Sequence, residues 1–215
     1  MTTREEDILM SENLIKKGIV IDKLLDSLIV TPNVKQTDLI LGDKNAVLVA
    51  ARILAYGPEY TTEINNPNDS NQKIEHTFDL SQCPFKELSD DIKYNGNSFD
   101  FTTPVGKNKL KFKILTGADE ILMNKDIEQS AKYGYQTTIS TRLRYSVIEV
   151  DGDNKAETIT SFTQNMLARD SVALRNQILK VSPDIDMTSE IEMGGETVSV
   201  SIPLSVEFFW PKSIA

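Results

Sequence analysis

Near the start of the chain, apolar residues recur with the spacing of one helix face. Ile21, Leu24, Leu25 and Leu28 follow the i, i+3, i+4, i+7 pattern, and Pro32 ends the predicted helix. Such a stripe is typical of a helix that packs on the protein's own core. The alternative is a helix that binds a partner through the same face.

A second helix is predicted further along the chain. It is expected to begin at Asp43, whose side chain can cap the first turn, and to end before Gly57-Pro58. Its buried stripe is expected to consist of Val47, Ala50, Ala51 and Leu54.

Alternation of apolar and polar residues predicts β-strands on both sides of a later helical stretch. Residues 60–80 read as a hairpin with a long polar loop, and short strands are expected around 99–101 and 109–114. Residues 191–202 predict a tight hairpin whose turn contains Gly194-Gly195.

From about Gly117 to Pro183 the apolar period is helical. The signals for four helices are, in order, the acidic pair Asp119-Glu120, the series Ile139, Leu143 and Val147, the pair Phe162 and Met166, and Asp170 as an N-cap before Leu174 and Ile178. These patterns predict an α+β fold in which β-hairpins flank a helical lobe, as a single compact unit with sub-lobes.

The predicted organisation is an N-terminal arm with an amphipathic helix, followed by one α+β domain. The arm covers residues 1–42 and the domain covers 43–215. Within the domain, residues 58–116 are expected to be β-rich, 117–183 helical, and 186–211 a C-terminal hairpin.

Charge and cysteine content restrict the classes of partner. The chain has a net charge of −9 and a pI of about 4.7, so it is expected to bind neither nucleic acid nor a membrane surface. Cys83 is the single cysteine, which excludes an intrachain disulfide and a cysteine-based zinc site and fits a reducing compartment. The N-terminus does not resemble a signal peptide, and no apolar run reaches the roughly 18 residues of a membrane span, so a cytoplasmic location is expected.

Motifs for catalysis or cofactor binding fail on inspection. Gly106-Lys107 lacks the spacing of a phosphate loop. The sequence from Asp151 begins like a calcium-binding loop, but Lys155 occupies a position where that motif requires a ligand. His76 is the only histidine, and Cys83 has no base near it in the sequence. We therefore expect no catalytic residue, metal, cofactor or small-molecule ligand, and no enzymatic activity. The 32 acidic residues leave open one alternative, a hydrolase with dispersed carboxylates.

The aromatic residues near the C-terminus are suited either to core packing or to anchoring a partner, since large rings contribute strongly to both. Together with the first amphipathic stripe they form the candidate partner-binding set, which comprises Phe208, Phe209, Trp210, Pro211, Leu24 and Leu28.

Four segments carry a resemblance to a known family. Residues 198–211 contain V-S-I-P-L and F-F-W-P, which is similar to the closing signature of the T-even phage baseplate hub proteins and hub assembly proteins. Residues 43–60, with the turn Y-G-P-E-Y, residues 78–88 and residues 169–175 resemble further segments of that family. The chain departs from the relatives that carry CxxC-like pairs in their hairpins, so a zinc-ribbon role is not expected.

The resemblance implies a protein of a contractile-tailed phage that takes part in forming the central hub of the tail baseplate. The expected function is that of a chaperone-like assembly factor, whose partners are other baseplate hub proteins and which acts in the host cytoplasm. The alternative is a permanent structural subunit of the hub in the virion.

Overall fold

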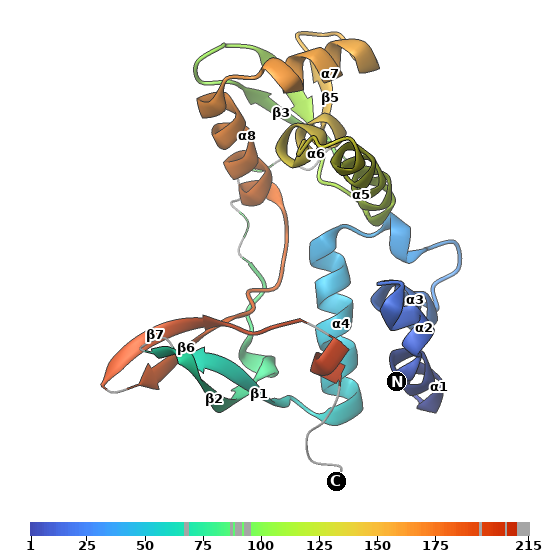
Figure 1. Cartoon of the computed structure of the whole chain (residues 1–215), viewed down its shortest axis with the longest axis vertical. Coiled ribbons are helices and arrows are strands. Elements are labelled where there is room, and N and C mark those ends of the chain that lie inside the picture. Colours follow the sequence, from blue (N-terminus) through green and yellow to red (C-terminus); the bar gives the residue numbers. More distant parts are fainter. Residues whose placement is uncertain are drawn as a thin grey trace. The chain divides into compact units, whose positions relative to one another are not determined.

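The structure is a computed structural model of the 215-residue chain. It describes residues 1–66, 69–86, 88, 92, 96–193, 195–204 and 206–209. The chain folds into two compact units, and the backbone passes between them more than once (Figure 1). Unit 1 comprises residues 1–36, 42–86 and 184–215, and unit 2 comprises residues 37–41 and 87–183. The predicted α+β class is confirmed.

The N-terminal residues form helices that belong to the core of unit 1. These helices are α1 (Thr3–Met10), α2 (Glu12–Lys16) and α3 (Val20–Leu28). The predicted amphipathic helix is therefore confirmed as α3, whose Leu24 and Leu25 are completely buried. Because they share a core with the hairpins, residues 1–36 are part of unit 1 and not a separate arm.

Helix α4 (Leu41–Tyr56) confirms the second predicted helix but buries a different face. Leu48 and Val49 are buried, whereas Ala50 is exposed and Leu54 is 84% exposed, so the predicted stripe was wrong at Ala50 and Leu54. Apolar residues surround most of this helix, so spacing alone does not select the buried face. The buried face also includes a cation, Arg52, which a hydrophobic pattern does not reveal.

Two antiparallel hairpins complete unit 1, as predicted. They are β1 (Glu59–Asn66) with β2 (Asp69–Asp79), and β6 (Thr188–Met193) with β7 (Glu196–Ser201). Tyr60 pairs with Phe78 and Ile64 with Ile74. The strands of the first hairpin extend into the predicted long loop, because backbone pairing between strands does not require apolar side chains. In the second turn Gly195 has a φ of 89°, which glycine adopts readily, while Gly194 lies outside the described residues.

The core of unit 1 also includes Phe208 and Phe209. The described residues include three short 3-10 helices, η1 (Gln36–Asp38), η2 (Leu80–Gln82) and η3 (Val206–Phe209). The ring of Phe208 lies edge-on to Tyr60 at 4.9 Å between centroids, and edge-on to Phe209 at 5.3 Å. Such pairs stabilise a core beyond the area they bury.

In its described residues, unit 2 combines a three-stranded antiparallel sheet with four helices (Figure 1). The strands are β3 (Phe99–Thr102), β4 (Lys109–Phe112) and β5 (Val147–Val150), in the order β3-β4-β5. The helices are α5 (Gly117–Lys132), α6 (Thr138–Ser146), α7 (Ala156–Asn165) and α8 (Ala168–Val181). The four predicted helices are confirmed, but Val147 begins a strand and does not continue a helix. Its β-branched neighbours favour an extended backbone there.

Helix α8 begins differently from the prediction. Leu167 occupies the N-cap, and Asp170 lies buried in the first turn. The Asp170 carboxylate accepts hydrogen bonds from the backbone N–H groups of Val105, at 2.8 Å, and Gly106, at 2.9 Å. The N–H groups that a phosphate loop would offer to a ligand are here bound by the protein's own carboxylate. This arrangement agrees with the failure of the phosphate-loop motif.

Candidate partner-binding surface

Helices α6 and α8 of unit 2 border an open groove with an apolar floor. Its volume is about 450 Å³, and the side chains that define it are Ile139, Arg142, Val172, Arg175 and Leu179. Three large apolar residues are open to solvent there, since Leu179 is 64% exposed, Ile139 54% and Val172 46%. Exposed apolar side chains gathered in one hollow are typical of a binding surface.

The groove follows from the pattern of helix α8. Val172, Arg175 and Leu179 lie at i, i+3 and i+7, so they share one face of the helix. Leu174 and Val181, on another face, are completely or almost completely buried in the core of unit 2. Helix α8 therefore carries one apolar face that is buried and a second that is largely exposed.

A neighbouring hollow extends this surface along the same helices. It has a volume of about 520 Å³ and shares Ile139, Leu143, Val172 and Arg175 with the groove. Met166, which follows α7, lines its far part. The two hollows are therefore continuous, and we refer to them together as the α6–α8 groove.

The charge of the two helices is opposite to that of the whole chain. Their basic residues are Arg142, Arg144, Arg169, Arg175 and Lys180, whereas their one acidic residue is Asp170. Asp170 is buried and bonded to the loop before β4, so it offers no negative charge at the surface. Arg144 is ion-paired with Asp126. Arg142 and Arg175, which line the α6–α8 groove, therefore make it a basic region in a protein of net charge −9.

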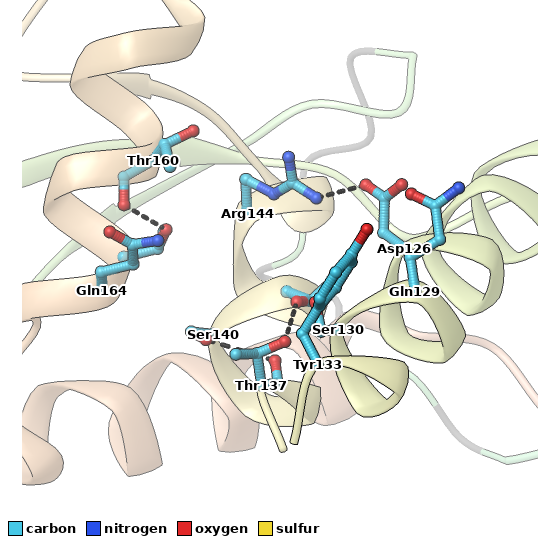
Figure 2. A pocket seen from close by; sticks show the side chains of 11 residues that line it. Asp126, Gln129, Ser130, Tyr133, Thr137, Ser140, Arg144, Thr160 and Gln164 are labelled. Carbon is cyan, nitrogen blue, oxygen red and sulfur yellow. Dashed lines mark hydrogen bonds and ion pairs between the residues drawn. The ribbon is translucent and has the colours of Figure 1, made fainter. Parts of the chain in front are cut away.

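A second, polar pocket of about 350 Å³ is lined by residues of α5, α6 and α7 (Figure 2). In Figure 2 the Arg144 guanidinium extends toward the Asp126 carboxylate, with which it forms an ion pair. Asp126 also accepts a hydrogen bond of 2.8 Å from the Tyr145 hydroxyl, and this bond, followed by that from Arg144, lowers the pKa of Asp126. A hydrolase acid needs a raised pKa, so this pocket does not support the hydrolase alternative.

Four of the residues that the sequence selected for partner binding lie in or beside the core of unit 1. Leu24, Phe208 and Phe209 are buried, and Leu28 is half-buried against the same core. These side chains thus pack in the core, which is the first of the two uses considered above. A role for them in binding a partner stays a prediction. Trp210 and Pro211 lie outside the described residues.

The residues considered for catalysis have ordinary packing roles. His76 lies edge-on to Phe78, with ring centroids 4.7 Å apart. Burial, followed by the charges of Asp186 and Asp79, raises the pKa of the Cys83 thiol, which is the reverse of what activates a cysteine nucleophile.

The calcium-like stretch is a surface turn. Asp151 accepts hydrogen bonds from the Asn108 side chain at 2.8 Å and from the Lys109 backbone at 2.7 Å. Asp153 accepts from the Lys155 backbone and from the Thr158 hydroxyl. Across the described ranges, no cluster of three or more His, Cys, Asp or Glu side chains could hold a metal ion. No helix in the described part of the chain is long and apolar enough to cross a membrane.

Sequence reasoning did not single out the α6–α8 groove, although its signals are present in the sequence. The spacing of Val172, Arg175 and Leu179 predicts a second helix face beside that of Leu174. The excess of arginine over acid in these two helices is also readable. Which of the two apolar faces is buried depends on where the sheet packs, and the pattern alone does not decide that.

Comparison with known proteins agrees with the resemblance in the sequence. No curated protein and no solved structure matches the chain. A family model described as T4 bacteriophage base plate protein matches residues 1–210, nearly the whole of the 215-residue chain. The chain therefore belongs to the family of T4 bacteriophage base plate proteins.

Proposed function

We propose that this base plate protein is an assembly factor, which binds a hub component in the host cytoplasm while the baseplate forms and acts without catalysis. The α6–α8 groove is the observation that supports this role. An assembly factor covers a sticky surface of its client for a limited time, so it needs apolar side chains that are exposed when the client is absent. Ile139, Val172 and Leu179 meet that requirement.

The size of the groove fits a transient complex. A permanent hub subunit would need a large interface, commonly above about 2,000 Å² and more apolar than the rest of the surface. The α6–α8 groove consists of two continuous hollows with three exposed apolar side chains, bordered by arginines. An exchangeable contact of moderate affinity suits a groove of this kind.

The second candidate is a permanent structural subunit of the baseplate hub. The family description favours it, because it names a base plate protein without reference to assembly. Both candidates use the α6–α8 groove for binding, and they differ in whether the protein stays in the finished particle.

Quantitative mass spectrometry of purified tails, beside a pull-down from infected cells, separates the two candidates. An assembly factor is expected to be absent from tails and to be recovered with a hub protein from the lysate. A stoichiometric signal in tails would overturn the assembly role and establish the structural one.

Complementation of a phage that lacks the gene tests whether the groove is needed. Leu179→Asp should fail to restore baseplates, whereas Leu54→Asp, a change at an exposed leucine of α4 in unit 1, should restore them. Equal complementation by both variants would contradict a role for the groove.

A further inference from the structure

We propose that the α6–α8 groove binds an acidic amphipathic helix of a partner protein. This inference rests on the proposed function in one respect, namely that the protein binds another baseplate protein. It specifies the surface that is used and the chemistry of the segment that occupies it.

The shape of the groove favours a helix as the occupant. Its floor is formed by side chains of two helices, with Ile139 on α6 and Val172 and Leu179 on α8. Helix α8 has 14 residues, so it is about 21 Å long at a rise of 1.5 Å per residue. A partner helix of about four turns matches this length and can place apolar anchors at i, i+3 or i+4, and i+7 in the groove.

The charge around the groove selects an acidic partner. Arg142 and Arg175 line it directly, while Arg169 and Lys180 lie exposed near the two ends of α8. The Nε of Arg175 donates to the backbone carbonyl of Ser171 at 3.4 Å, which holds the side chain along the helix. Glutamate or aspartate on the outer face of a bound helix would lie among these cations.

Arg144 does not contribute to this surface, because its ion pair with Asp126 directs it into the polar pocket on the α5 side of α6 (Figure 2). The cations that border the groove thus come from other positions of α6 and α8. Ion pairs at a solvent-exposed rim each add little affinity but steer association and reject basic partners. The apolar floor would supply most of the affinity, and the arginines would supply specificity.

An apolar floor distinguishes this groove from a nucleic-acid site. A phosphate backbone needs cations and hydrogen-bond donors along its path. Arg142 and Arg175 supply cations at this groove, but the large side chains most exposed in it are Ile139, Val172 and Leu179, which offer neither. The rest of the chain is acidic, so a nucleic acid would be repelled from the surrounding surface.

Photocross-linking in infected cells tests the identity of the occupant. A photoreactive p-benzoylphenylalanine replaces Leu179 in the full chain, and a matched control carries it in place of Leu54, which is exposed in unit 1. The adducts are sequenced by mass spectrometry. The expected result is an adduct, specific to position 179, whose partner peptide is acidic and has apolar residues at helical spacing. A neutral or basic peptide, a second copy of this chain, a nucleic acid, or no adduct specific to position 179 would overturn the proposal.

Charge reversal tests the role of the arginines with the same partner. The double change Arg142→Glu and Arg175→Glu should weaken binding of the cross-linked partner by about tenfold or more at low salt, and by less at high salt. The control Lys132→Glu and Lys155→Glu makes the same change of net charge at exposed lysines outside the groove and should leave binding unchanged. Equal binding by both double variants would contradict the charge argument. Matching thermal unfolding curves of the variants would show that the fold is preserved.

These outcomes separate the inference from the proposed function. If the protein is stoichiometric in tails and still cross-links to an acidic helix, the assembly role fails while the groove inference holds. If the protein is absent from tails and cross-links through position 179 to a segment that is not acidic, the assembly role holds while the groove inference fails.

Discussion

The Nε of Arg52 donates a hydrogen bond of 3.0 Å to the backbone carbonyl of Phe208, which lies 156 positions later in the chain. The same guanidinium donates to the carbonyls of Gly57 and Glu59, both at 3.1 Å, and lies over the ring of Tyr56. It is almost completely buried, and this burial lowers the pKa of Arg52. Two of the segments that carry the family resemblance, 43–60 and 198–211, are therefore joined through one side chain, which indicates a structural role for both.

Replacing Arg52 should destabilise unit 1 strongly. Arg52→Met leaves the three carbonyls buried without their donor, and we expect a loss of about 3–5 kcal/mol in the free energy of unfolding. Arg52→Lys should also be destabilising, because an ammonium group cannot reproduce the planar fork that reaches all three acceptors. Urea unfolding measures both changes. The control is Arg169→Met at an exposed site of α8, for which a change within about 0.5 kcal/mol is expected.

Glu5 makes the stability of unit 1 sensitive to acid. Its carboxylate accepts hydrogen bonds from the Ser27 hydroxyl at 2.6 Å, and from the backbone N–H and the hydroxyl of Thr2, both at 2.7 Å. These bonds, with that from Ser27 the largest cause, lower the pKa of Glu5 from its ordinary 4.5 to about 2. A lowered pKa in the folded state means that the stabilisation is complete above pH 4.5 and is lost as the pH falls toward 2.

Glu5→Gln tests this dependence on pH. At neutral pH the variant should be less stable than the wild type by about 1–2 kcal/mol, because it loses hydrogen bonds to a charged acceptor. The difference should shrink as the pH is lowered from 4.5 toward 2, and thermal unfolding at a series of pH values measures it. A difference that stays constant over this range would show that the charge of Glu5 does not contribute.

Asp170 is expected to stabilise the loop before β4. Asp170→Ala removes the acceptor of the Val105 and Gly106 N–H groups, and we expect a loss of about 2–3 kcal/mol in unfolding free energy. Asp170→Asn keeps one oxygen acceptor and should cost less. A Cβ added at Gly106 would lie 2.6 Å from the Asn108 side chain and 3.1 Å from Asp170, so Gly106→Ala should also be destabilising. Equal stability of all three variants and the wild type would contradict this account.

The sequence predicted the element types well because the periods of two and 3.6 residues depend on local geometry. Both hairpins and helices α3, α4, α6, α7 and α8 follow from such patterns, and α5 follows from the acidic pair at its start. The errors occurred where a local pattern is compatible with more than one buried face or more than one type of secondary structure. Helix α4 is apolar on several faces, so the exposure of Leu54 follows from packing against distant segments. Val147 fits the helical series of α6, but it pairs with Phe112 on β4.

The candidate site was harder to predict than the fold. Phe208 and Phe209 attract attention as large aromatics near the chain end, yet their burial depends on contacts with Tyr60 and Arg52, more than a hundred residues away. Conversely, Val172 and Leu179 appear as ordinary apolar positions of a helix. Their exposure depends on which face of α8 packs on the sheet, and this is a tertiary property that the sequence period does not contain.

The two leucines of α8, Leu174 and Leu179, offer the most direct comparison between folding and binding. Leu174 is completely buried, so Leu174→Ala should lower the free energy of unfolding by about 2–5 kcal/mol through lost contacts and a cavity. Leu179 is 64% exposed, so Leu179→Ala should change stability by less than about 0.5 kcal/mol. Urea unfolding of both variants measures the contrast.

For partner binding we expect the larger loss in Leu179→Ala and the smaller in Leu174→Ala, at temperatures where both variants are folded. Leu179→Ala removes an anchor from the floor of the α6–α8 groove and should weaken recovery of the partner from infected cells, whereas folded Leu174→Ala keeps the groove and should recover it normally. Because the two changes delete the same atoms from one helix, differences in intrinsic helix propensity cancel, and recovery is normalised to the amount of folded variant in each lysate. Loss of binding in Leu174→Ala alone would place the interface elsewhere and leave the exposure of Leu179 without a function.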